Sequence, residues 1–232
     1  LFPALHEELR DAVPISAIGT VRVVRILEPD PSRPDGAPRF ATYAPPHLLV
    51  EEAIRHLHGT HGVRIFNLSI GYSEPFNDLH LGPLTETIDD LVRELGLVVV
   101  LPTGNAPANL SARTPSGHHI IADKPEFFFA PEHRLSEPGP AALAVTVGAL
   151  ALSGAPAELP GRVGWQAAAD ADEAAPFSRT GPGLGTNSRR ANKPDVTHYG
   201  GNLVVSDTGN VVHNDLGASL ILDPPMGRVV VG

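Results

Sequence analysis

The chain has 232 residues, of which 42% are hydrophobic and 19% charged, and its formal net charge is −9 at pH 7. This size suits one α/β domain, and the acidic balance with dispersed basic residues argues against binding to nucleic acid or to an anionic membrane. The sequence holds no cysteine and no apolar run long enough to cross a membrane, which excludes disulfides, thiolate metal sites and a cysteine nucleophile within it.

Strands and helices alternate in the first half of the sequence. In chain order, the expected elements are a helix over 1–10, a strand over 21–27, a helix over 47–58, a strand over 63–69, a helix over 84–95 and a strand over 97–101. The helix over 84–95 has an apolar stripe at the helical period, and the strand over 97–101 is apolar throughout. Short crossovers between such strands require a parallel sheet. The expected fold class is therefore α/β, a mainly parallel sheet with helices on both faces.

The second half is less regular. Residues 106–140 are loop-rich, and a strand is expected over 143–150. Residues 153–175 are rich in Ala, Gly, Pro and acidic residues and indicate a surface excursion. A hairpin with a polar turn is expected near 203–213, and we find no internal repeat.

The segment LVVVLPTGN, residues 97–105, is the most informative in the chain. It predicts a buried strand that ends in Gly104 and a polar amide, Asn105. In open α/β sheets the carboxyl ends of the strands hold the reactive groups, and an asparagine there can direct its N–H at an oxyanion. The alternative is a plain Gly-Asn turn after a strand.

Five short segments around this strand share an order along the chain. They are RIFNLSIG (64–71), LPTGN (101–105), AVTVGA (144–149), PFSRTGP (176–182) and KPDV (193–196). Together they resemble the substrate-binding strand, the oxyanion-hole GN, the TVGA strand, the FS-x-x-GP loop and the KPD segment of the subtilases, the subtilisin-like serine peptidases. The nearest variety is a bacterial group with PTGN in place of AAGN and with YGGN, here residues 199–202, after KPD.

This resemblance implies that Asn105 is the catalytic oxyanion donor and that an extended peptide pairs with the chain as an added strand. The substrate-binding residues it implies are Ser69, Ile70, Gly71, Tyr72, Leu101, Pro102, Thr103 and Gly104. Pro102 and Thr103 replace alanines usual in the family, and Tyr72 replaces a frequent glycine. These changes argue against a simple preference for large apolar side chains. For Ser69, a buried serine bonded to backbone is an equally open alternative.

The same resemblance implies that residues 1–232 are the central part of a single subtilase-like catalytic domain. The family's Asp and His motifs would precede this segment and its Ser motif would follow it. The expected function is a serine endopeptidase in the full-length protein, with the isolated chain inactive. Its partner would be a peptide or protein substrate, and no cofactor or metal is expected. The absence of cysteine and of a visible signal peptide slightly favours a cytoplasmic location.

Two other classes of function are alternatives to a peptidase. A pseudo-peptidase or peptide-binding module that keeps the fold without catalysis remains open, because the triad motifs are not in view. A small-molecule or nucleotide-binding enzyme is disfavoured, because no G-x-G-x-x-G or P-loop follows any expected strand.

Three segments imitate catalytic motifs. The HGTH of residues 58–61 is interpreted as a helix end with Gly59 or Gly62 as its cap. The DTG of residues 207–209 is interpreted as a hairpin turn, and the GAS of residues 217–219 is followed by two prolines that cannot open a buried helix. We therefore expect His58, His61, Asp207 and Ser219 not to converge on one site.

Overall fold

The computed structural model describes residues 19–34, 38–77, 80–106, 112–154, 164–186, 189–190, 192–209, 212–221 and 228–231. The chain divides into two units, residues 1–43 and residues 44–232. The helix expected over 1–10 lies outside the described residues. All the segments that resemble subtilase motifs belong to the second unit.

The first unit contains a short antiparallel pair, β1 (Leu27–Pro29) and β2 (Pro38–Phe40). The strand expected over 21–27 is wrong for residues 21–26, which form no regular element. Val21 and Val23 are exposed, so these β-branched residues have no strand partner and no core to pack against. The strand was predicted from the β-branched residues alone, but a strand also needs a partner strand and a core to pack against.

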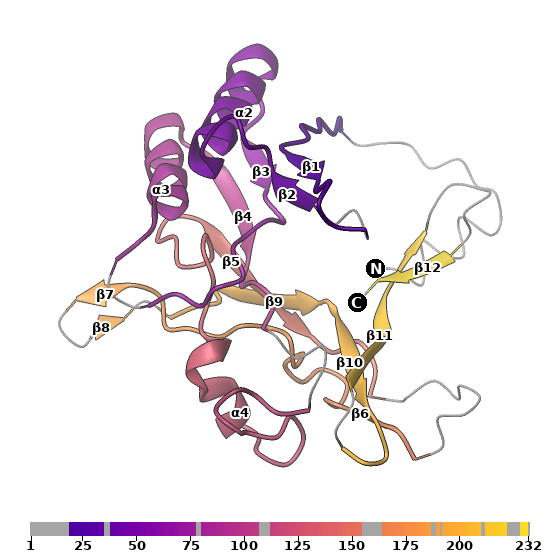
Figure 1. Cartoon of the computed structure of the whole chain (residues 1–232). Helices are drawn as coiled ribbons and strands as arrows, with labels where there is room; N and C mark the ends of the chain where they lie inside the picture. The colour runs from indigo at the N-terminus through magenta and orange to yellow at the C-terminus, as the bar shows by residue number, and fades with distance from the viewer. Residues whose placement is uncertain are drawn as a thin grey trace. The chain divides into compact units, whose positions relative to one another are not determined.

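The second unit is built on a four-stranded parallel sheet in the order β3-β4-β5-β9 (Figure 1). Its strands are β3 (Ile65–Asn67), β4 (Val98–Pro102), β5 (Val145–Leu150) and β9 (Val196–Tyr199), each parallel to its neighbour. The expected α/β class is confirmed, and the strand bounds differ from those expected by a few residues. All four strands therefore end at one edge of the sheet.

One helix precedes β3 and another follows it. They are α2 (Pro46–His61) and α3 (Pro83–Leu95), and each has a proline in its first turn. Both end at a left-handed glycine, Gly62 (φ 66°) for α2 and Gly96 (φ 63°) for α3. The HGTH segment is thus the last turn of α2, as expected, with Gly62 rather than Gly59 as the cap.

Burial alternates along β3 and β4 of the parallel sheet. Phe66, Val99 and Leu101 are buried on one face, while Ile65 and Val98 are exposed on the other. The two long helices contact each other and lie on the same side of β3 and β4 (Figure 1). Helical cover for the second face, which a parallel sheet ordinarily has, is not seen in the part of the chain that the structure describes.

A second sheet is antiparallel, in the order β12-β11-β10-β6. It contains β6 (Gln166–Ala167), β10 (Gly201–Val205), β11 (Val212–Ile221) and β12 (Arg228–Val231), and a separate short pair joins β7 (Gly185–Thr186) to β8 (Arg189–Arg190). The pairing of β10 with β11 confirms the hairpin expected near 203–213. The surface excursion expected over 153–175 is wrong at Gln166–Ala167, because these residues pair with β10.

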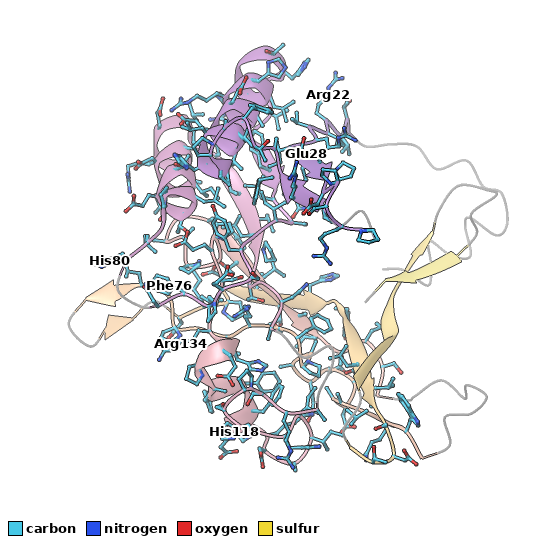
Figure 2. The ribbon with its side chains drawn as sticks, viewed as in Figure 1. Arg22, Glu28, Phe76, His80, His118 and Arg134 are labelled. Carbon is cyan, nitrogen blue, oxygen red and sulfur yellow. The ribbon has the colours of Figure 1, made fainter. Side chains whose placement is uncertain are left out.

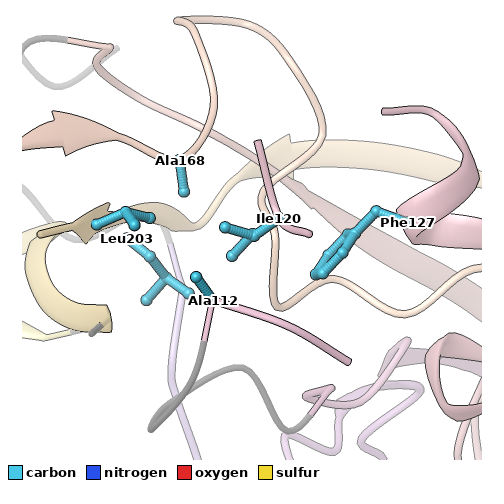
Figure 3. Close-up of a cluster of buried hydrophobic side chains, with 6 residues drawn as sticks. Ala112, Ile120, Phe127, Ala168 and Leu203 are labelled. Carbon is cyan, nitrogen blue, oxygen red and sulfur yellow. The ribbon is translucent and has the colours of Figure 1, made fainter. Parts of the chain in front are cut away.

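The loop-rich stretch before β5 packs against later parts of the chain in a small hydrophobic core. It includes α4 (Glu126–Phe129) and the 3-10 turn η1 (Pro131–His133). The cluster of apolar side chains, shown in Figure 3, consists of Ala112, Ile120, Phe127, Ala168, Leu203 and Val205. Residues far apart in the sequence thereby anchor the loops that lead to the edge of the parallel sheet.

Asp89 on α3 ties this helix to the segment before β5. It is only 7% exposed, and its carboxylate accepts hydrogen bonds from the backbone N–H groups of Ala142 (2.9 Å) and Leu143 (2.8 Å). Asp89→Ala should lower the free energy of unfolding by about 2 kcal/mol, because two N–H groups lose a charged acceptor. Urea unfolding of the full-length protein measures this.

The neighbouring aspartate provides the matched control. Asp90 forms an exposed ion pair with Arg93 at 2.8 Å. Asp90→Ala should therefore change the free energy of unfolding by less than about 0.5 kcal/mol. Equal decreases in the free energy of unfolding in the two variants would contradict the conclusion that Asp89 holds α3 to the segment before β5.

Candidate active site

The segments that follow β3 and β4 meet at the carboxyl edge of the parallel sheet, where two adjoining cavities open. The first cavity, of about 440 Å³, is lined by Ser69, Ile70, Gly71, Tyr72, Ser73, Pro102, Gly104, Asn105, Ser136 and Glu137. The second, of about 340 Å³, shares Ser69, Pro102, Gly104 and Asn105 with it and extends to β5 and β9. Gly71 and Asn105, which follow different strands, therefore lie at the same edge of the sheet.

Asn105 stands on the rim between the two cavities with its side chain exposed. Its backbone is held by a bridge to Ser178, by the Nε of Arg179, which donates to its carbonyl at 3.0 Å, and by Ala106 N–H bonding to Phe177. Within the described part of the chain, no hydrogen bond engages its side-chain amide. A fixed backbone with a free amide is what a donor aimed at a ligand requires.

Gly104 supplies the turn that presents Asn105. Its φ is +91°, and a Cβ at this position would lie 1.9 Å from Ser136 Oγ. The preceding residues turn inward. Thr103 is buried with its Oγ1 3.4 Å from Ser178 Oγ, and Leu101 is buried in the core. Leu101 and Thr103 border the second cavity but not the first, so only Pro102 and Gly104 face Gly71 as expected.

The segment after β3 forms the other wall. Ser69 is exposed, and its hydroxyl accepts a hydrogen bond from the Asn67 amide at 3.0 Å, so it is not the buried, backbone-bonded serine of the alternative. Gly71 lies against the main chain of Glu137, whose carbonyl would be 2.7 Å from an added Cβ and accepts from Tyr72 N–H at 2.9 Å. Burial, with a smaller effect of the Glu137 charge, raises the pKa of Tyr72.

Two polar residues of the first cavity were missed by the sequence analysis. Ser136 is 1% exposed, and its hydroxyl has no hydrogen-bond partner in the described part of the structure. Glu137 accepts from Gly82 N–H at the start of α3, and burial raises the pKa of its carboxyl. Both lie in the loop-rich 106–140 region, where no periodicity marks a position. Only their approach to Gly104 and Gly71 places them at the cavity.

Two of the segments that resemble subtilase motifs, PFSRTGP (176–182) and KPDV (193–196), hold β5 in place. Ser178 Oγ accepts from Ala149 N–H at 3.0 Å. Lys193 is buried, and its ammonium donates to the Ala144 carbonyl (2.9 Å) and to Asp195 (2.6 Å), which in turn accepts from Thr146 N–H (2.7 Å). Ser178 lines the second cavity, whereas Lys193 and Asp195 stabilise the sheet edge and line neither cavity.

The motifs that imitate a triad are engaged elsewhere. The Nδ1 of His58 is 2.9 Å from the Val63 carbonyl at the end of α2, and Asp207 caps Thr208 N–H in the β10–β11 turn. No serine hydroxyl of the described residues bonds to His58 or His61. Ser219 lies in β11, and its side chain is outside the description. Nor do the described residues contain a cluster of His, Asp and Glu suited to a metal ion, or a helix able to span a membrane.

His133 ends the turn η1, three residues before Ser136 of the first cavity. Its ring is packed against Phe127, with ring centres 4.3 Å apart, and its Nδ1 has no hydrogen-bond partner among the described residues. Burial, opposed by the Glu132 charge and assisted by that of Arg179, lowers the pKa of His133 from 6.5 to about 4. The folded ring therefore stays neutral at pH values where the unfolded ring is protonated.

This shift predicts an acid-sensitive stability. Between pH 6.5 and about 4 the unfolded state binds more protons, so the free energy of unfolding should fall as the pH falls and level off below about pH 4. His133→Phe should remove this contribution, which is at most about 1.4 kcal/mol per pH unit. Urea unfolding of the wild type and the variant across this range tests it, and parallel pH dependences would contradict it.

Residues 46–227 of the chain match the subtilase family. The chain belongs to this family. This subtilase is 34% identical over 157 residues to an uncharacterized protein, y4bN, of Sinorhizobium fredii (strain NBRC 101917 / NGR234), covering 67% of the chain and 35% of that protein.

Two solved structures are similar to parts of this subtilase. The prenylagaramide maturation protease PagA is similar at 16% identity and a TM-score of 0.38, covering 77% of this chain and 44% of that one. MycP1 with its N-terminal propeptide removed is similar at 17% identity and a TM-score of 0.37, covering 82% and 49%. Because these TM-scores are low, the family assignment rests on the sequence match. The chain spans from about a third to about half of the length of these relatives.

Proposed function

We propose that the full-length protein is a serine endopeptidase in which Asn105 donates a hydrogen bond to the oxyanion. The supporting observation is the Asn105 amide on the rim between two cavities: among the described residues no hydrogen bond engages it, and its backbone is held at three points. In peptide hydrolysis the attacked carbonyl oxygen becomes an anion, and a donor already in place stabilises that anion more than it stabilises the carbonyl.

The proposed substrate is an extended peptide lying along residues 69–72. Ser69 and Gly71 are exposed at the first cavity, so their main chain is accessible to a peptide backbone that adds as a strand. The side chain of the residue at the cleaved bond would enter the first cavity, between Tyr72 and Pro102. Both residues line this cavity, whose wall also carries Ser136.

The nucleophile, its histidine base and the orienting aspartate would come from other parts of the full-length protein. This fits the engagement of His58 and Asp207 in local contacts and a chain that spans only part of its relatives. Residues 1–232 would thus be the central part of the catalytic domain of the PTGN variety, inactive alone. The competing proposal is a pseudo-peptidase that binds peptides in the same groove without cleaving them.

A serine-directed fluorophosphonate reagent separates the two proposals. If the full-length protein is a serine peptidase, the reagent should label it at one serine, and protein that has first been denatured by heat should take up no label. The unlabelled protein should cleave casein, and the labelled protein should not. Full-length protein that binds peptides but takes up no label and cleaves none would establish the pseudo-peptidase. Cleavage that persists after complete labelling would overturn the serine mechanism.

A further inference from the structure

Arg179 is a buried cation whose guanidinium contacts the backbone on several sides of the candidate site. It is 1% exposed and is among the largest fully buried side chains of the described residues. Its Nε donates to the carbonyl of Asn105 (3.0 Å), and its Nη1 donates to the carbonyls of Glu132 and Arg134 (2.8 Å each). Its Nη2 donates to the Ser73 carbonyl at 2.5 Å.

These four acceptors belong to three separate loops. Ser73 continues the substrate-side segment after β3, Asn105 follows β4, and Arg134 lies just before Ser136 in the loop that leads to β5. Each loop contributes residues to the first cavity. The third loop also joins the first directly, through Phe76 N–H bonding to the Leu135 carbonyl at 2.6 Å, and Figure 2 labels Phe76 and Arg134 near this junction.

Burying a guanidinium costs desolvation free energy, which a neutral side chain in a purely structural role would avoid. Burial of the guanidinium lowers the pKa of Arg179, with the charge of Glu74 acting in the opposite direction. Among the described residues, Arg179 donates only to neutral carbonyls and to no carboxylate. What the guanidinium offers over a neutral side chain is a rigid planar fork that fixes several acceptors relative to one another.

We propose that Arg179 is a positioning residue: its fork sets the orientation of the Asn105 amide and the spacing of the walls of the first cavity. This proposal rests on the proposed function in one respect, the catalytic use of Asn105. Lysine at position 179 could keep the charge and one or two of these hydrogen bonds but could not span three loops. Arg179 would thus act on catalysis through Asn105, without touching the substrate.

The decisive experiment is a double-mutant cycle in the full-length protein with Arg179→Lys and Asn105→Ala. Arg179→Lys alone should lower kcat about 100-fold, with a smaller change in KM, because it displaces the oxyanion donor. In the Asn105→Ala background the same substitution should have little effect on kcat, since the donor is already gone. Equal factors in the two backgrounds would overturn the proposal and leave Arg179 as a general structural tie.

Hydrogen exchange supplies a readout that does not need activity. In Arg179→Lys, peptides containing residues 73–76, 103–106 and 132–136 should exchange faster together, while α2 keeps its wild-type rate. Unchanged exchange in these loops would overturn the proposal even if kcat falls. If the full-length protein cleaves no peptide, the proposed function fails, and exchange still decides whether Arg179 holds Asn105.

Arg113 provides the matched control. It also donates to a main-chain carbonyl, that of Gly117 at 3.0 Å, but it is exposed and lines neither cavity. Arg113→Lys should leave kcat, KM and the exchange of the three loops unchanged. If Arg179→Lys fails to fold, Arg179→Gln carries the same comparison.

Discussion

Asn105→Ala in the full-length protein should lower kcat by about 100- to 1,000-fold and change KM little, which corresponds to a loss of about 3–4 kcal/mol in the transition state. The reason is that the carbonyl oxygen acquires its negative charge only when the attacked carbon becomes tetrahedral, so the side-chain amide acts mainly on the transition state. The ground-state carbonyl gains much less from the same donor. Steady-state kinetics on a peptide substrate measure both constants.

Two further variants sharpen this result. Asn105→Asp should be at least as damaging as Asn105→Ala, because a carboxylate repels the developing charge. Asn77→Ala, at another exposed asparagine that lines neither cavity, should leave kcat unchanged. A rise in KM with kcat intact in Asn105→Ala would instead mean that Asn105 is a substrate-binding or turn residue.

Gly104→Ala should destabilise the folded protein by about 3–5 kcal/mol, the sum of a strained left-handed backbone and an overpacked site. The backbone φ of +91° disfavours any side chain, and the new Cβ would lie 1.9 Å from Ser136 Oγ and 3.1 Å from Arg179 Cδ. Both neighbours are buried and cannot swing into solvent. Urea unfolding of the full-length protein measures the loss.

Gly59→Ala is the matched control for this substitution. Gly59 lies in the last turn of α2, and nothing lies within 4 Å of its ideal Cβ. This variant should stabilise the protein by about 0.5–1 kcal/mol through reduced chain entropy. The double variant Gly104→Ala/Ser136→Gly should recover the steric part of the loss but not the backbone part. A loss below about 1 kcal/mol in Gly104→Ala would show that the turn accepts a side chain.

The parallel sheet was predictable because its signals are local. Residues 97–101 form an apolar run too short for a helix, and the stripe of α3 follows the helical period, so hydrophobic burial specifies both. The same reasoning was wrong at Val21 and Val23, which have strand-forming side chains but are exposed. Strand propensity reflects packing against neighbours, and these residues have no strand partner.

The sequence alone determined the family, the α/β class and the position of Asn105 at the end of a buried strand, because each depends on a short motif or a local hydrophobic period. Only the tertiary structure placed Ser136, Glu137 and Arg179 at the site. Their positions depend on loops that follow no period and meet through backbone hydrogen bonds between residues up to 106 positions apart. Such contacts are set by how the loops pack against one another, which no local pattern of residue types encodes.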